Sequence, residues 1–217
     1  MSPLAALILG WAITGLWPIV GKKGLTLFSG LLYSQAGLLV ALVVLAPALA
    51  RRGRWRRLID PAIRRDLFLV GLLATTAPSV LFITALEYTS AANAAIAAQI
   101  EVVYSALLCA WLLKERVSLT QAAASALVIA GTSIALTRDL GSVHWKGDLI
   151  ILLTPWAFQL SHIIAKRLPA DLDAWTIAGG RLGYGALAFL PFTLWGLLHG
   201  PRWTWSAEAA GLILFQG

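Results

Sequence analysis

Hydrophobic residues form seven long runs separated by short polar segments, and this pattern predicts a set of membrane-spanning helices. A helix needs about 20 mostly apolar residues to cross the hydrocarbon core of a bilayer. The seven runs cover residues 4–20, 27–50, 67–86, 91–113, 119–137, 148–165 and 175–198. An eighth run begins at Ala207 and reaches only Gly217, which is too short to span. We therefore predict an all-α, polytopic membrane helix bundle.

Two parts of the chain are similar to each other at a separation of about 145 residues, which indicates an internal repeat. Trp11-Ala12 and the later pair Lys22-Lys23 correspond to Trp156-Ala157 and the later pair Lys166-Arg167. Five spans precede the second copy, and an odd number would insert that copy in the opposite orientation, as in many secondary transporters. We expect a first five-helix repeat over residues 1–140 and an incomplete second repeat over residues 145–217.

The composition supports a bilayer protein and excludes two other classes. Of 217 residues, 59% are hydrophobic and 12% are charged, and the mean hydropathy is +0.80. Soluble domains carry about 25% charged residues, so this chain has too few to cover a water-soluble globule. Disorder would require low hydrophobicity and high charge. Ten tryptophans fit residues that gather at the level of the lipid headgroups.

The net charge of +7 is concentrated in one place. Seven of the twelve arginines lie between residues 51 and 65, between two apolar runs and without a nucleic-acid recognition motif. Such a cluster sets orientation and meets anionic lipid, so we expect no nucleic-acid partner. With a cytoplasmic N-terminus, the inner loops hold 11 Lys and Arg residues and the outer loops 5, which favours this orientation. Lys22 and Lys23 then lie on the outer side, against the rule.

Several short motifs resemble the EamA family of the drug/metabolite transporter superfamily. They are ALEYTSAANAA at residues 85–95, QIEVV at 99–103, LLKERVSL at 112–119, Ala130-Gly131, and WAITGLWP at 11–18 in the first span. The resemblance implies ten helices in two inverted repeats, which rock around a cavity and move a small metabolite or drug-like solute across the cytoplasmic membrane. The chain departs from the family at Val102, where proline is usual, and at Gln35, where arginine is common. The family's second Glu-Arg signature would lie beyond Gly217, so we expect a fragment of a ten-helix protein.

Glu101 is the first candidate for the substrate pathway, because it is an ionisable residue near the middle of a predicted span. Such residues are costly in a bilayer and usually functional. Asn93, Ala97, Glu101 and Tyr104 are spaced by four, four and three residues and share one helix face. Glu101 could bind a cationic or polar substrate or carry a coupling proton. The alternative is a structural carboxylate that pairs with Arg181 or accepts a hydrogen bond from Tyr104.

Other candidates lie on the first, sixth and seventh spans. Gln159 and His162 share a face with Pro155, whose missing N–H frees a backbone carbonyl that could line a cavity; the alternative is a simple kink. Trp11 could form part of an aromatic wall for an organic cation, or pack at the interface. For Arg181 we favour a structural role or an ion pair, in a helix whose glycines allow close packing.

The sequence offers no sign of catalysis. It contains no His-Glu-x-x-His, P-loop, Gly-x-Ser-x-Gly or Cys-x-x-Cys motif, and its three histidines lack metal-ligand spacing. We predict a transporter that is not an enzyme, with no cofactor and no metal, a small-molecule substrate and a lipid bilayer around it. The sequence is compatible with a monomer or a homodimer. The alternative function is a non-transporting or lipid-handling membrane subunit.

Overall fold

The computed structural model describes the chain except residues 1–2, 52–53, 113, 115–116, 138–144 and 201, and the side chains of residues 3, 6, 7, 11, 14, 109, 112 and 135–137. The described residues form helices and no strand, with a single isolated bridge between Phe28 and Trp203. The prediction of an all-α membrane bundle is confirmed.

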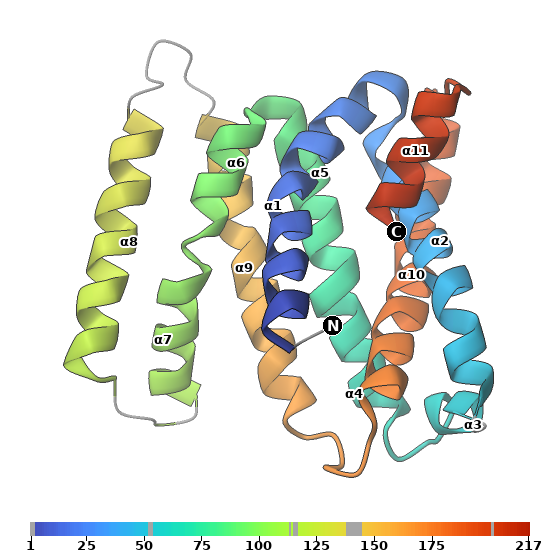
Figure 1. Cartoon of the computed structure of the whole chain (residues 1–217), viewed down its shortest axis with the longest axis horizontal. Helices are drawn as coiled ribbons and strands as arrows, with labels where there is room; N and C mark the ends of the chain where they lie inside the picture. Colours follow the sequence, from blue (N-terminus) through green and yellow to red (C-terminus); the bar gives the residue numbers. More distant parts are fainter. Residues whose placement is uncertain (1–2, 52–53, 113, 115–116, 138–144, 201) are drawn as a thin grey trace.

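The helices follow the predicted order along the chain (Figure 1). They are α1 (Pro3–Leu27), α2 (Gly30–Ala50), α3 (Arg54–Leu58), α4 (Arg64–Gly71), the π-helical turn η2 (Leu72–Thr76), α5 (Ala77–Tyr88), α6 (Ala91–Ala98), α7 (Glu101–Leu112), α8 (Leu119–Thr137), α9 (Trp145–Ala165), α10 (Ala174–Leu198) and α11 (Ala207–Gln216). Three details differ from the sequence prediction. The first helix continues through Lys22 and Lys23, a π-helical turn interrupts the third span, and the fourth span is broken between α6 and α7.

Within the described residues, five helical stretches are long and apolar enough to cross a membrane. They are Gly30–Ala50, Arg64–Tyr88, Ala91–Leu108, Trp145–Ala165 and Ala174–Leu198. Two shorter apolar helical stretches, Leu119–Ile134 and Ala207–Gln216, accompany them. The chain is therefore a multi-pass membrane protein.

The arginine cluster lies at one end of the bundle, which we call the arginine end: the end where α2 stops, α3 lies and α10 begins (Figure 1). The end of α7, the start of α8 and the end of α9 lie at the same end. The described parts of the three loops that the sequence assigns to the cytoplasmic side, after α2, α7 and α9, therefore lie at one end of the bundle.

The two lysines that oppose this orientation have structural partners at the other end. The Lys22 Nζ atom donates hydrogen bonds to the carbonyl oxygens of Leu86 and Thr89, the latter at 2.8 Å, and so satisfies the end of α5. Lys23 forms an ion pair with Glu208 at the start of α11. Both lysine side chains thus have hydrogen-bond or ion-pair partners within the protein.

Close helix packing depends on glycines of α10. A Cβ atom at Gly179 would lie 2.6 Å from a methyl of Leu49 on α2, and one at Gly180 would lie 2.8 Å from a methyl of Leu67 on α4. These contacts belong to the core at the arginine end, which includes Leu45, Leu49, Leu58, Ile63, Leu67 and Leu168. A second core, around Phe28, Tyr33, Phe82, Leu86, Ile151 and Ile213, joins α1, α2, α5, α9 and α11. Trp17 and Phe82 at the second core, and Leu182 at the first, also line the site described next.

Candidate functional site

A cavity of about 1080 Å³ lies inside the bundle and receives side chains from α1, α2, η2, α5, α6, α7, α8, α9, α10 and α11. Apolar residues such as Trp17, Phe82 and Phe158 form part of its wall. Its polar lining residues are Ser34, Thr75, Ser79, Gln99, Glu101, Ser105, Gln121, Ser125, Thr154, Gln159, Arg181 and Gln216. Mostly apolar pockets of this size with a few placed polar groups are typical of small-molecule sites.

Glu101 reaches the cavity from a break in the fourth span. The Gln99 side chain donates a hydrogen bond to the Ala95 carbonyl at 3.3 Å, the carbonyl that a regular helix would offer to the Gln99 backbone N–H. The Gln99 and Ile100 N–H groups donate instead to Ile96 and Ala97, which tightens the turn. The next helix, α7, then begins at Glu101, so the carboxylate lies in a first turn, where the helix dipole favours negative charge.

Gln159 links this carboxylate to the second predicted repeat. Its Nε2 atom donates a hydrogen bond to Glu101 Oε1 at 2.9 Å, and its side chain is buried. Pro155, one helical turn before Gln159 on α9, lines the same cavity. The two residues on one face of the sixth span thus both reach the cavity wall.

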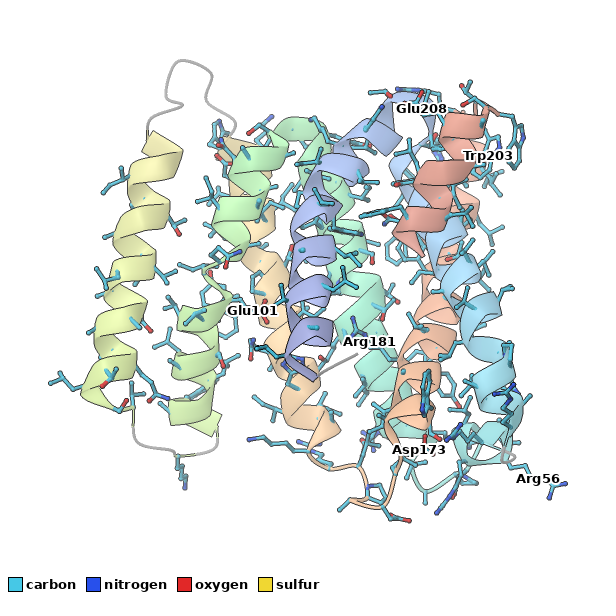
Figure 2. The ribbon with its side chains drawn as sticks, in the orientation of Figure 1. Arg56, Glu101, Asp173, Arg181, Trp203 and Glu208 are labelled. Atoms are coloured by element: carbon cyan, nitrogen blue, oxygen red, sulfur yellow. The ribbon has the colours of Figure 1, made fainter. Side chains whose placement is uncertain are left out.

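Arg181 lies on the wall as well, at about the same level of the bundle as Glu101 (Figure 2). Its Nη2 atom donates to the Ala74 carbonyl at 3.3 Å and its Nε atom to Thr75 Oγ1 at 3.4 Å, both within η2. The guanidinium also lies over the Phe158 ring, 5.9 Å from its centre. Across the described residues Arg181 forms no ion pair, and its hydrogen bonds go to η2.

The remaining predicted residues lie away from the wall or outside the description. Tyr104 packs against Trp156, with ring centres 4.9 Å apart, and Asn93 is buried in the first turn of α6. His162 is exposed in the last turn of α9. None of these three is among the lining residues of the described cavity. The side chain of Trp11 lies outside the described residues.

Sequence reasoning missed several polar lining residues, among them Thr75, Gln99 and Gln121. Gln99 and Gln121 are amides inside or beside apolar runs, so their polarity could have marked them. Thr75, next to Thr76, carries a weaker signal, because threonine is common in spanning helices. No group of three or more His, Cys, Asp or Glu side chains in the described part of the chain is placed to hold a metal ion.

Comparison with known proteins agrees with a multi-pass helical membrane protein. The sequence model of the EamA-like transporter family matches residues 1–137. The chain belongs to this family. It is also 27% identical over 129 residues to an uncharacterized transporter of Methanothermobacter thermautotrophicus, an alignment that covers 57% of this chain and 38% of the archaeal protein. The chain thus spans well under half the length of that relative. No solved structure matches the chain.

Proposed function

We propose that the protein moves a small organic solute across the cytoplasmic membrane by alternating access, with Glu101 and Gln159 on the substrate pathway. The observation that carries this proposal is the 2.9 Å hydrogen bond between these two side chains on the wall of a cavity of about 1080 Å³. A carboxylate inside a spanning segment is energetically costly, and such residues usually serve a function. Membership of a transporter family supports the same conclusion.

An inverted repeat would provide the two moving halves. In Figure 1, α1 and α9 run in opposite directions, as do α2 and α10, and α5 and α11. The packing is also consistent with these three pairs of corresponding helices. If each helix is replaced by its counterpart, the contact of α5 with α9 becomes the contact of α11 with α1, and both contacts are present; α2 packs on its own counterpart, α10. Under this proposal Glu101 belongs to the first half and Gln159 to the second. Rocking of one half against the other would then make and break the contact between them.

The charges in the cavity suggest what the solute contacts. The carboxylate of Glu101 accepts hydrogen bonds or pairs with a cationic group, and the Gln159 amide holds it in place. Arg181 is held by η2 through its hydrogen bonds. We therefore propose a solute with a cationic or hydrogen-bond-donating group that meets Glu101.

The proposed orientation places the arginine end in the cytoplasm. The described basic residues at that end include Arg51, Arg54, Arg56, Arg57, Arg64, Arg65, Lys114, Lys166 and Arg167. At the opposite end the described basic residues include Lys22, Lys23, Lys146 and Arg202, of which Lys22 is bonded to the end of α5 and Lys23 to Glu208. A loop bias of this kind normally faces the cytoplasm.

The test is solute counterflow with the full chain in proteoliposomes, screened against a panel of cationic, neutral and anionic metabolites. We expect saturable uptake of at least one cationic or donor-bearing solute, and a loss of at least about tenfold in Glu101→Gln, the cost of about one hydrogen bond to a charged group. Glu87→Gln is the matched control, because Glu87 is exposed and is not among the cavity-lining residues. Unchanged uptake in Glu101→Gln would contradict the role of Glu101. Absence of saturable uptake across the panel would contradict transport and favour the lipid-handling alternative.

A further inference from the structure

A second, smaller cavity lies at the arginine end and shares no lining residue with the central cavity. Its volume is about 260 Å³, and it is lined by Ala48 near the end of α2, Arg51, Arg54 at the start of α3, and Trp175 in the first turn of α10. Because one water occupies about 30 Å³ of liquid, the cavity has room for about eight water-sized groups. That is enough for a phosphodiester and its neighbouring carbon atoms.

Arg54 is a rigid part of this cavity. Its side chain is 10% exposed, and its Nε atom lies 3.0 Å from Asp173 Oδ1 and 3.1 Å from Oδ2. Its Nη1 atom donates to the Ala48 carbonyl at 2.6 Å. The bonds from two of its three nitrogen atoms therefore fix the position and orientation of the guanidinium. The third nitrogen, Nη2, has no hydrogen-bond partner among the described residues.

Arg51 supplies charge that the surrounding protein does not balance. It is exposed at the C-cap of α2, and its guanidinium has neither an ion pair nor a hydrogen bond within the described part of the chain. The nearby carboxylate, Asp173, is already occupied, since it accepts hydrogen bonds from Arg54 and from the backbone N–H groups of Trp175 and Thr176. The cavity therefore carries one positive charge in excess.

The tryptophan places the cavity at the surface of the membrane. Trp175 is 52% exposed and lies in the first turn of the 25-residue apolar helix α10, the position at which indole rings meet lipid headgroups. Trp55 on α3 is also exposed at this end, at 47%. An anion in this cavity would thus lie at headgroup depth, with its remaining atoms directed to the lipid chains.

From these observations we propose that Arg51, Arg54 and Trp175 form a binding site for the phosphodiester of an anionic phospholipid. Guanidinium groups bind phosphate oxygens through paired, charge-assisted hydrogen bonds, and basic pockets beside spanning helices are suited to anionic headgroups. The bound lipid would join the end of α2 to the start of α10. This proposal is independent of the proposed transport function and is tested by lipid binding alone.

The experiment titrates the delipidated full chain in detergent with dioleoyl phosphatidylglycerol and counts bound lipid by native mass spectrometry. Phosphatidylcholine and inorganic phosphate are titrated in parallel, because they share the phosphate chemistry but lack the net lipid charge or the lipid chains. We expect phosphatidylglycerol to bind at least about tenfold more tightly than either. Equal binding of inorganic phosphate would assign the site to a free anion and overturn the proposal, and equal binding of phosphatidylcholine would overturn the preference for anionic lipid.

Variants separate a defined site from general attraction to the charged end. Arg51→Gln should weaken phosphatidylglycerol binding about tenfold, whereas Arg56→Gln removes the same charge from an exposed side chain that points away from the bundle (Figure 2) and should change it less than about twofold. Arg51→Lys keeps the charge and removes the planar fork, so it should also weaken binding. Equal losses in Arg51→Gln and Arg56→Gln, or full binding in Arg51→Lys, would overturn the proposal.

Discussion

Gln159 of α9 donates a hydrogen bond to Glu101 at the point where α6 gives way to α7, with 2.9 Å between Nε2 and Oε1. The two residues are 58 positions apart in the sequence. Glu101 lies in the segment that matches the EamA-like family, and Gln159 lies outside it. The contact therefore crosses from the first predicted repeat to the second, and it can be tested from either side.

Removal of the Gln159 amide should impair the site without removing its charge. In Gln159→Leu, Glu101 loses its hydrogen-bond donor on α9, so the carboxylate no longer has a fixed position for the solute. We expect solute counterflow in proteoliposomes to fall about tenfold, which corresponds to one hydrogen bond to a charged group. Leu160→Ala is the control, because its side chain is 36% exposed on the same helix. A Gln159→Leu protein that transports like Leu160→Ala would contradict the proposed role.

Much of this architecture could be predicted from the sequence, because the spans depend on the length and hydropathy of each run. The break before Glu101 could not, since no proline or glycine marks it: the N–H groups of Gln99 and Ile100 turn to the carbonyls of Ile96 and Ala97, and the Gln99 side chain bonds to the Ala95 carbonyl. The π-helical turn does have a signal in the sequence, because Pro78 has no N–H to donate to the Ala74 carbonyl, and this carbonyl accepts a hydrogen bond from Arg181 instead.

The candidate site was predictable where a polar group stood out in an apolar run, and less so elsewhere. Glu101 and Gln159 both reach the cavity wall. Tyr104 follows Glu101 within α7, but it packs on Trp156 and does not line the cavity. Asn93 shares a helix face with Glu101 by spacing, but the break between α6 and α7 separates the two residues, and Asn93 is buried in α6 away from the cavity wall. Spacing rules assume a continuous helix, so they fail beyond a break.

Glycines within one helix should respond differently to alanine. At Gly185 of α10 a Cβ atom would lie 2.7 Å from Thr75 Cβ and 3.1 Å from the Gly71 carbonyl oxygen, so α10 and α4 would have to separate. We expect Gly185→Ala to lower the free energy of unfolding in detergent by about 1–3 kcal/mol. At Gly183 the nearest atom is a Leu42 methyl at 3.9 Å, so Gly183→Ala should be neutral or stabilise by up to about 1 kcal/mol. Similar unfolding midpoints for the two variants would contradict the close packing of α10.

The two lysines that oppose the charge bias should differ in their effect on stability. Lys22→Met leaves the carbonyl groups of Leu86 and Thr89 without their donor at the end of α5, and should cost about 1–2 kcal/mol. Lys23→Met breaks an ion pair in which both side chains are more than half exposed, and should cost less than about 1 kcal/mol. Thermal unfolding of the two variants in the same detergent checks this order. A larger loss in Lys23→Met would show that Lys22 does not stabilise α5.

Acid should weaken the junction between α3 and α10 through Asp173. Burial acts to raise the pKa of this carboxyl, but hydrogen bonds from Thr176 and the charge and hydrogen bond of Arg54 outweigh it and hold the pKa below its ordinary value of 3.8. A lowered pKa contributes stability that is complete above the unfolded value and is lost as pH falls through the folded one. We therefore expect wild type to be more stable than Asp173→Asn at pH 7, and this difference in stability to disappear below about pH 4.

Asp171→Asn serves as control, since the pair of Asp171 with Arg57 is largely exposed, and it should differ little from wild type in stability at every pH. Unfolding midpoints measured from pH 7 to pH 3 decide the matter: a constant gap between wild type and Asp173→Asn would mean that the charge of Asp173 does not stabilise this junction.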